Sequence, residues 1–182
     1  TDKGIELRVH PTLIPETRLL ANVDGVMNAI VVHGDAVGPT LHYGAGAGAE
    51  PTASAVIADI VDVVRALDLN DIQRVPPLGF HDQQTDVPIM SIEDIESAYY
   101  LRLQVEDRAG VMADVAEILG GQDISMEAIL QKEPQEIGGE ASIILLTRKV
   151  LESNMNSAIR AIEALSSTHG KVMRIRVETL KN

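Results

Sequence analysis

The order of two hydrophobic periods in residues 99–182 most constrains what this chain can fold into. Alternating apolar and polar residues, which indicate half-buried strands, occupy residues 99–106, 124–132, 141–149 and 172–179. Apolar residues spaced three and four apart, which indicate helices, occupy residues 111–120 and a segment that begins at Ser153 or Asn154. Turn-forming residues at 134–139 join the two middle strands as a hairpin. The predicted order is therefore β-α-β-β-α-β.

This order predicts a four-stranded antiparallel sheet with both crossover helices on one face, which is the ferredoxin-like arrangement. The helices bury one face of the sheet and leave the other face and the sheet edges without cover. Because exposed sheet edges are usually paired or covered, we expect dimerisation or another element of the chain at these edges.

The first half of the chain has shorter and less regular segments. Strands are predicted at residues 5–9, 25–33 and 37–43. Since few residues separate them, antiparallel pairing is expected. Residues 51–67 then carry apolar side chains at spacings of three and four, which predicts an amphipathic helix with Pro51 in its first turn.

Periodicity is lost between Asp68 and Ser97, where proline, glycine and polar residues indicate a linker. Within it, Ser91-Ile92-Glu93-Asp94 has the form of a capping box and predicts a short helical turn. The chain is therefore expected to be α+β. It should contain a partial antiparallel-sheet region with a long helix at residues 1–70, a linker at 71–98 and the βαββαβ domain at 99–182.

The stretch Gly44-Ala45-Gly46-Ala47-Gly48-Ala49 lies directly before the helix predicted at residues 51–67. Alternate glycines leave one face of the backbone bare, and a helix N-terminus attracts anions. The stretch satisfies the degenerate G-x-G-x-x-G/A pattern, but a dinucleotide-binding unit continues into a second strand and an acidic ribose ligand. No apolar strand follows the helix, so a self-contained nucleotide-binding domain is not predicted.

Composition argues against several functions. A net charge of −12 and a pI near 4.7 oppose binding to nucleic acid or anionic membranes. The chain has no cysteine, and its five histidines lack metal-ligand spacing, so we expect neither disulfides nor a metal site. The absence of cysteine and of a long apolar run favours a cytoplasmic protein. A chain that opens on Thr1 rather than Met also suggests a piece of a longer protein.

Residues 100–113, Tyr-Leu-Arg-Leu-Gln-Val-Glu-Asp-Arg-Ala-Gly-Val-Met-Ala, followed by Gly121 and Ile124-Ser125, resemble the opening of an ACT domain. In that family the D-x-x-G turn after the first strand lines a pocket for a free amino acid, generally at an interface between two such domains. The resemblance implies that the effector contacts come from Asp107, Ala109, Gly110, Val111 and Met112. Helix-terminal amides suit a carboxylate, and an aspartate suits an ammonium group. The alternative is structural: Asp107 caps the helix and Gly110 makes the turn.

Four motifs in the first 67 residues resemble, in order, the end of the catalytic region of homoserine dehydrogenase. They occupy residues 8–15, 23–30, 34–38 and 44–59. The resemblance implies the C-terminal part of an NAD(P)-dependent oxidoreductase that interconverts L-homoserine and L-aspartate 4-semialdehyde in threonine, methionine and isoleucine biosynthesis. It also implies that Gly48, and next Gly46, contact NAD(P) in the intact enzyme.

The family's catalytic lysines and the residues that bind the substrate amino group are absent, since no lysine lies between Lys3 and Lys132. We therefore expect no catalytic residue, no bound cofactor and no activity in this chain by itself. The resemblance implies threonine as the effector and a homo-oligomer formed through the ACT and substrate-domain sheets. Two other interpretations stay open: a non-enzymatic amino-acid-binding regulatory module, and a dimerisation domain without a ligand.

Overall fold

The structure is a computed structural model, and it describes residues 1–67, 69, 79, 86–132 and 139–180. Contacts divide the chain into unit 1, residues Thr1–Pro15 with Val87–Asn182, and unit 2, residues Glu16–Asp86. The elements of unit 1 are β1 (Thr12–Leu13), η3 (Ile92–Asp94), β4 (Glu96–Glu106), α2 (Val111–Gly121), β5 (Met126–Lys132), β6 (Glu140–Thr147), β7 (Val150–Leu151), α3 (Glu152–Glu163) and β8 (Met173–Val177). Those of unit 2 are η1 (Leu19–Asn22), β2 (Met27–Gly34), β3 (Gly38–Ala45) and α1 (Ala49–Ala66). The predicted α+β class is confirmed.

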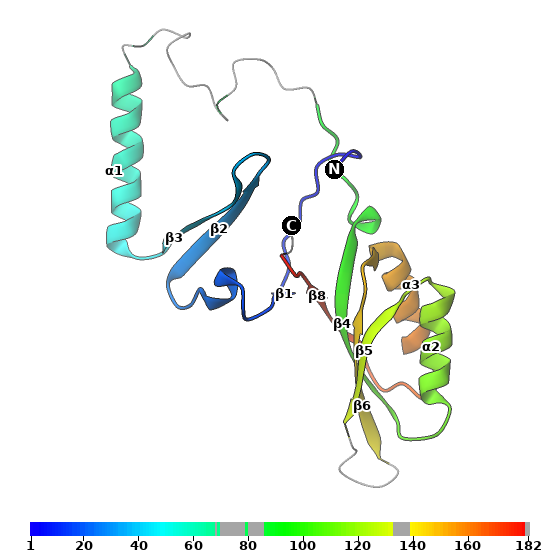
Figure 1. The fold of residues 1–182 in the computed structure, drawn as a ribbon. Helices are drawn as coiled ribbons and strands as arrows, with labels where there is room; N and C mark the ends of the chain where they lie inside the picture. Colours follow the sequence, from blue (N-terminus) through cyan, green and yellow to red (C-terminus); the bar gives the residue numbers. More distant parts are fainter. Residues whose placement is uncertain (68, 70–78, 80–85, 133–138, 181–182) are drawn as a thin grey trace. The chain divides into compact units, whose positions relative to one another are not determined.

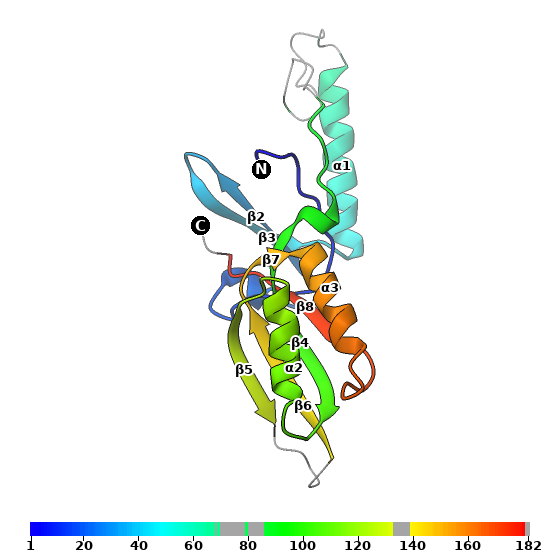
Figure 2. The ribbon, with the colours of Figure 1, turned by 90° about the vertical axis from the view of Figure 1, so that its right-hand side faces the viewer.

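Unit 1 contains a sheet in the order β1-β8-β4-β6-β5, with α2 and α3 on one face (Figure 1). The pairs β8–β4, β4–β6 and β6–β5 are antiparallel, which confirms the βαββαβ prediction. Figure 2 shows both helices lying across this face. The core between helices and sheet contains Tyr99, Leu101, Leu103, Val105, Val111, Val115, Leu119, Ala141, Ile143, Leu145, Met155, Ala158 and Ile162. Burying each large aliphatic side chain stabilises the fold by about 1.5–3 kcal/mol.

The β8 edge of this sheet is covered by an element from the start of the chain. Strand β1 runs parallel to β8, with Thr12 opposite Arg176 and Leu13 opposite Val177. The Glu178 amide also donates a hydrogen bond to the Leu13 carbonyl at 2.9 Å. Residues 1–15 therefore belong to unit 1, although their sequence resembles the catalytic region.

The strand predicted at residues 5–9 is wrong. Only Ile5 makes a β-bridge, an isolated parallel one to Ile89, and residues 6–10 form no ladder. Alternation of apolar and polar residues fits any extended segment, but a strand also needs a neighbouring backbone in register. Leu7 and Val9 accordingly remain exposed.

Unit 2 consists of an antiparallel hairpin and one long helix. Strands β2 and β3 pair along their whole length, from Met27 opposite Ala45 to Gly34 opposite Gly38. This pairing confirms the predicted antiparallel arrangement, and α1 confirms the predicted helix. No residue of α1 is buried, although the helix is clearly amphipathic. Its apolar face therefore has no cover among the residues that the structure describes.

Several helix ends differ in detail from the prediction. Ser91 caps the short helix η3 by accepting a hydrogen bond from the Glu93 amide, as the capping box predicts. Helix α3 begins at Glu152, earlier than expected. Its N-cap residue is Leu151, and its N-terminus has no side-chain cap among the described residues. The 134–139 hairpin lies, apart from Gly139, outside the described residues, as do residues 71–78 and 80–85 of the predicted linker.

Candidate functional site

A pocket of about 300 Å³ lies where β4 ends and α2 begins. All five residues implied as effector contacts line it: Asp107, Ala109, Gly110, Val111 and Met112. Most of the lining comes from one stretch, residues 105–112, because strand, turn and helix follow one another without interruption. Residues 107–110 of the lining are exposed to solvent. Val105, Val111 and Ile143 are buried and form the apolar part of the lining.

The turn at Gly110 leaves the start of α2 open. Gly110 is the N-cap residue, with φ 98° and ψ −26°, and no described side chain caps this terminus. A residue other than glycine would be strained at this φ. Asp107 therefore does not cap α2, which was the structural alternative for this residue. Its own amide instead donates to the Gly139 carbonyl at 3.1 Å.

Sequence reasoning missed the residues that the sheet brings to this pocket. Gln131 of β5 and Ile143 of β6 lie opposite each other in the strand register, and both line the pocket. Their chain positions are distant from the D-x-x-G turn. The predicted hairpin register was the one signal that could have placed them together.

The two glycines implied as cofactor contacts have structural requirements of their own. A Cβ built on Gly46 would lie 1.9 Å from Nδ2 of Asn28, so the exposed side chain of Asn28 would have to shift to admit a larger residue. Gly48 is the N-cap residue of α1 and has φ 125°. The backbone of unit 2 thus calls for glycine at Gly48, and cofactor contact at both positions stays a prediction.

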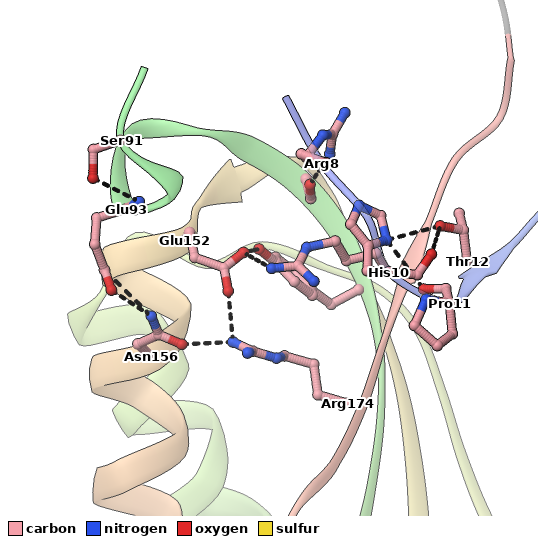
Figure 3. A network of polar contacts seen from close by, with 12 residues as sticks. Arg8, His10, Pro11, Thr12, Ser91, Glu93, Glu152, Asn156 and Arg174 are labelled. Atoms are coloured by element: carbon pink, nitrogen blue, oxygen red, sulfur yellow. Dashed lines mark hydrogen bonds and ion pairs between the residues drawn. The ribbon is translucent and has the colours of Figure 1, made fainter. Parts of the chain in front are cut away.

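A second polar cluster lies at the other end of β4, centred on Glu152 (Figure 3). Only 2% of Glu152 is exposed, and its carboxylate pairs with Arg176 Nη2 at 2.5 Å and Arg174 Nη1 at 3.0 Å. The Tyr99 hydroxyl donates to the same carboxylate at 2.6 Å. We call these four residues the Glu152 network. It joins α3, β8 and β4 across the sheet.

The network changes the acidity of its members. Burial, and then the hydrogen bond to Glu152, raise the pKa of Tyr99 to about 12. Burial by itself would raise the pKa of Glu152. The hydrogen bonds from Tyr99 and Arg176 and the two arginine charges outweigh it and hold that pKa below its ordinary value. Glu152 is therefore an ionised structural partner and not a proton donor near neutral pH.

In the part of the chain that the structure describes, no group of three or more histidine, aspartate or glutamate side chains could hold a metal ion. Among the same residues, no helix is long and apolar enough to cross a membrane.

Comparison with known proteins finds two families, each matching one of the two parts of the chain in which its motifs occur. A sequence profile described as homoserine dehydrogenase matches residues 2–61, and one described as ACT domain matches residues 99–167. A homoserine dehydrogenase from Pseudomonas aeruginosa is 58% identical over 99% of this chain. This chain belongs to the homoserine dehydrogenase family.

The chain spans about two fifths of the length of these homoserine dehydrogenases. It covers 42% of the Pseudomonas aeruginosa protein and 41% of one from Neisseria gonorrhoeae, to which it is 50% identical. The crystal structure of a homoserine dehydrogenase from Thiobacillus denitrificans superposes on the whole chain with a TM-score of 0.88 and 56% identity. That match covers 41% of the crystallised chain. The chain thus corresponds to the end of the family's catalytic region together with its ACT domain.

Proposed function

We propose that this chain works as the C-terminal part of an NAD(P)-dependent homoserine dehydrogenase. The whole enzyme interconverts L-homoserine and L-aspartate 4-semialdehyde by hydride transfer, a step in threonine, methionine and isoleucine biosynthesis. Support comes from family membership over the full length of the chain. By the same likeness the enzyme is a cytoplasmic homo-oligomer.

Within that enzyme, the ACT pocket binds a free amino acid, and threonine is the effector we propose. The single observation that carries this proposal is the open N-terminus of α2 inside a pocket of about 300 Å³. Free amides at a helix start attract a carboxylate through hydrogen bonds and the helix dipole. The amides of Val111 and Met112 would hold the effector carboxylate, and Asp107 would accept from its ammonium group. The volume suits a small ligand.

In the intact enzyme, Gly48 and next Gly46 would lie beside the nicotinamide end of NAD(P). Catalytic lysines would come from outside this chain, because none lies between Lys3 and Lys132. We therefore expect calorimetry to detect no NADPH binding to residues 1–182. Saturable NADPH binding would contradict the expectation that the cofactor binds only to the intact enzyme. It would make the glycine-rich stretch a nucleotide site by itself.

Titration calorimetry with threonine on residues 1–182 tests the effector proposal. We expect saturable heat, and Asp107→Asn should weaken binding at least tenfold because a neutral amide cannot compensate the ammonium charge. Glu117→Gln is the matched control, since Glu117 is an exposed carboxylate of α2 outside the pocket lining. It should bind threonine as the wild type does.

Other ligands separate the remaining alternatives. Heat with isoleucine or methionine but none with threonine would keep an amino-acid sensor and change its effector. If none of the three amino acids gives heat, the amino-acid-sensor hypothesis is excluded and a structural dimerisation domain is the interpretation that stays.

A further inference from the structure

Residues 4–13 form an extended segment, which we call the strap, along unit 1. At one end the Ile5 amide donates to the Pro88 carbonyl at 2.8 Å, and the Met90 amide donates to the Ile5 carbonyl at 2.9 Å. In the middle, Arg8 Nη1 donates to the hydroxyl of Ser97 at 2.7 Å. The other end is β1, paired with β8. The strap thus contacts both β4 and β8.

Little apolar surface holds the strap in place. Val9 is fully exposed and Leu7 is 61% exposed, whereas the β4 side chains Leu101 and Leu103 are 0% exposed. Segments held by a few backbone hydrogen bonds and little buried apolar area are the first to open in a folded protein. We therefore expect the strap to open before the core does.

Of the two strands that hold the strap, β4 reaches the effector pocket, and β8 is connected to the pocket end of β4 through the segment that precedes it. Strand β4 carries Ser97 near one end and the pocket residues Val105 and Glu106 at the other, about 26 Å away at roughly 3.3 Å per residue. The segment that leads into β8 is bonded to that same end: the Glu106 amide donates to the Ser167 carbonyl at 2.9 Å, and the His169 amide donates to the Gln104 carbonyl at 2.8 Å.

The Glu152 network ties these two strands together. Tyr99 belongs to β4, Arg174 and Arg176 belong to β8, and one buried carboxylate of α3 binds all three. Arg176 also lies opposite Thr12 of the strap in the strand register. Figure 3 draws Arg8, His10 and Thr12 together with this network. A change in how β4 and β8 pack would therefore reach the strap contacts directly.

We propose that the strap couples the ACT pocket to the rest of the enzyme: effector binding tightens the β4–β8 pair and fixes the strap, whose chain continues at Glu16 into unit 2. This inference rests on the proposed amino-acid binding. The Arg8–Ser97 contact is the anchor to test, because Arg8 belongs neither to the hydrophobic core cluster nor to the pocket lining.

Amide hydrogen exchange on residues 1–182, with and without saturating threonine, tests the coupling. Threonine should slow exchange of the Ile5, Met90 and Glu178 amides at least threefold. Arg8→Ala should speed exchange of these amides and, because coupling between two sites is reciprocal, weaken threonine binding at least threefold. Arg148→Ala, which removes an exposed arginine of unit 1 that lies outside the strap and the pocket lining, should change neither quantity.

The two proposals fail in different ways. Saturable threonine heat with unchanged strap exchange, or an unchanged dissociation constant in Arg8→Ala, would overturn the strap and leave effector binding intact. A flat calorimetric trace for the wild type would overturn effector binding and the strap coupling together. Equal effects of Arg8→Ala and Arg148→Ala would also overturn the strap, since they would reflect lost charge only.

Discussion

Helices α3 of unit 1 and α1 of unit 2 carry the same hydrophobic period but have opposite surroundings. Ile162 of α3 is 0% exposed, whereas Ile60 of α1 is 52% exposed. The sheet that covers α3 is encoded within the chain, while no described residue covers α1. The comparison teaches that a 3.6-residue period identifies an apolar face but does not identify its partner. The chain spans about 42% of the length of a related homoserine dehydrogenase.

The sharpest test of this difference replaces one aliphatic side chain in each unit. Leu103→Ala should reduce the free energy of unfolding of unit 1 by about 3–4 kcal/mol, because it leaves a cavity in a fully packed core. Ile60→Ala should change stability by less than about 0.5 kcal/mol, since exposed positions rarely matter more. Urea unfolding measures the first, and hydrogen exchange of the α1 peptides measures the second. Equal costs would mean that α1 packs in solution.

Replacing the buried acid of unit 1 should have the next largest effect. Glu152→Gln keeps the side-chain shape but leaves Arg174 and Arg176 without their counter-charge, which should cost about 3 kcal/mol. Glu163→Gln is the control, because its partner Lys171 is 88% exposed, and it should cost less than about 1 kcal/mol. Urea unfolding, followed by the fluorescence of tyrosines such as the buried Tyr99, measures both free-energy changes. A similar loss in the two variants would show that burial adds nothing to the Glu152 network.

Replacing two glycines of unit 1 by alanine tests whether the turn before α2 requires glycine. Gly110→Ala should cost about 1–2 kcal/mol because φ is 98° there. Gly120→Ala, inside α2 with no atom near the added Cβ, should gain about 0.5 kcal/mol from higher helix propensity. Thermal unfolding of the two variants measures both changes. A neutral Gly110→Ala would contradict a left-handed residue at this turn.

The smallest effect should come from mildly acid pH. Because the pKa of Glu152 is lowered in the folded state, its stabilisation is fully present above its ordinary value of 4.5 and is lost as pH falls through the lower folded value. The stability difference between wild type and Glu152→Gln should stay constant from about pH 7 to 5 and shrink below 4.5. A difference that already falls above pH 5 would mean that the folded pKa is not lowered. Urea midpoints at each pH measure it.

Local patterns predicted most of the secondary structure. The alternation in β4 and β6, the spacing in α2 and the Ser91 cap each depend on neighbouring residues, so the sequence displays them directly. The same alternation misled at residues 5–9, where no neighbouring strand completes a ladder. The five residues that the resemblance implied as effector contacts all line the pocket, because they lie within one short stretch, residues 107–112. Gln131 and Ile143 escaped because register, which is a long-range property, brings them there.

The sequence by itself determined the βαββαβ order, the helix at α1 and the resemblance to homoserine dehydrogenase and ACT domains, because period, turn chemistry and motifs are local. Tertiary structure alone decided that Arg174 and Arg176 face the helices and that both form ion pairs with one buried glutamate, Glu152. It also decided that residues 12–13 extend the ACT sheet. These features depend on which distant groups meet, and the free energy of a buried charge or a paired strand edge is set by its partner.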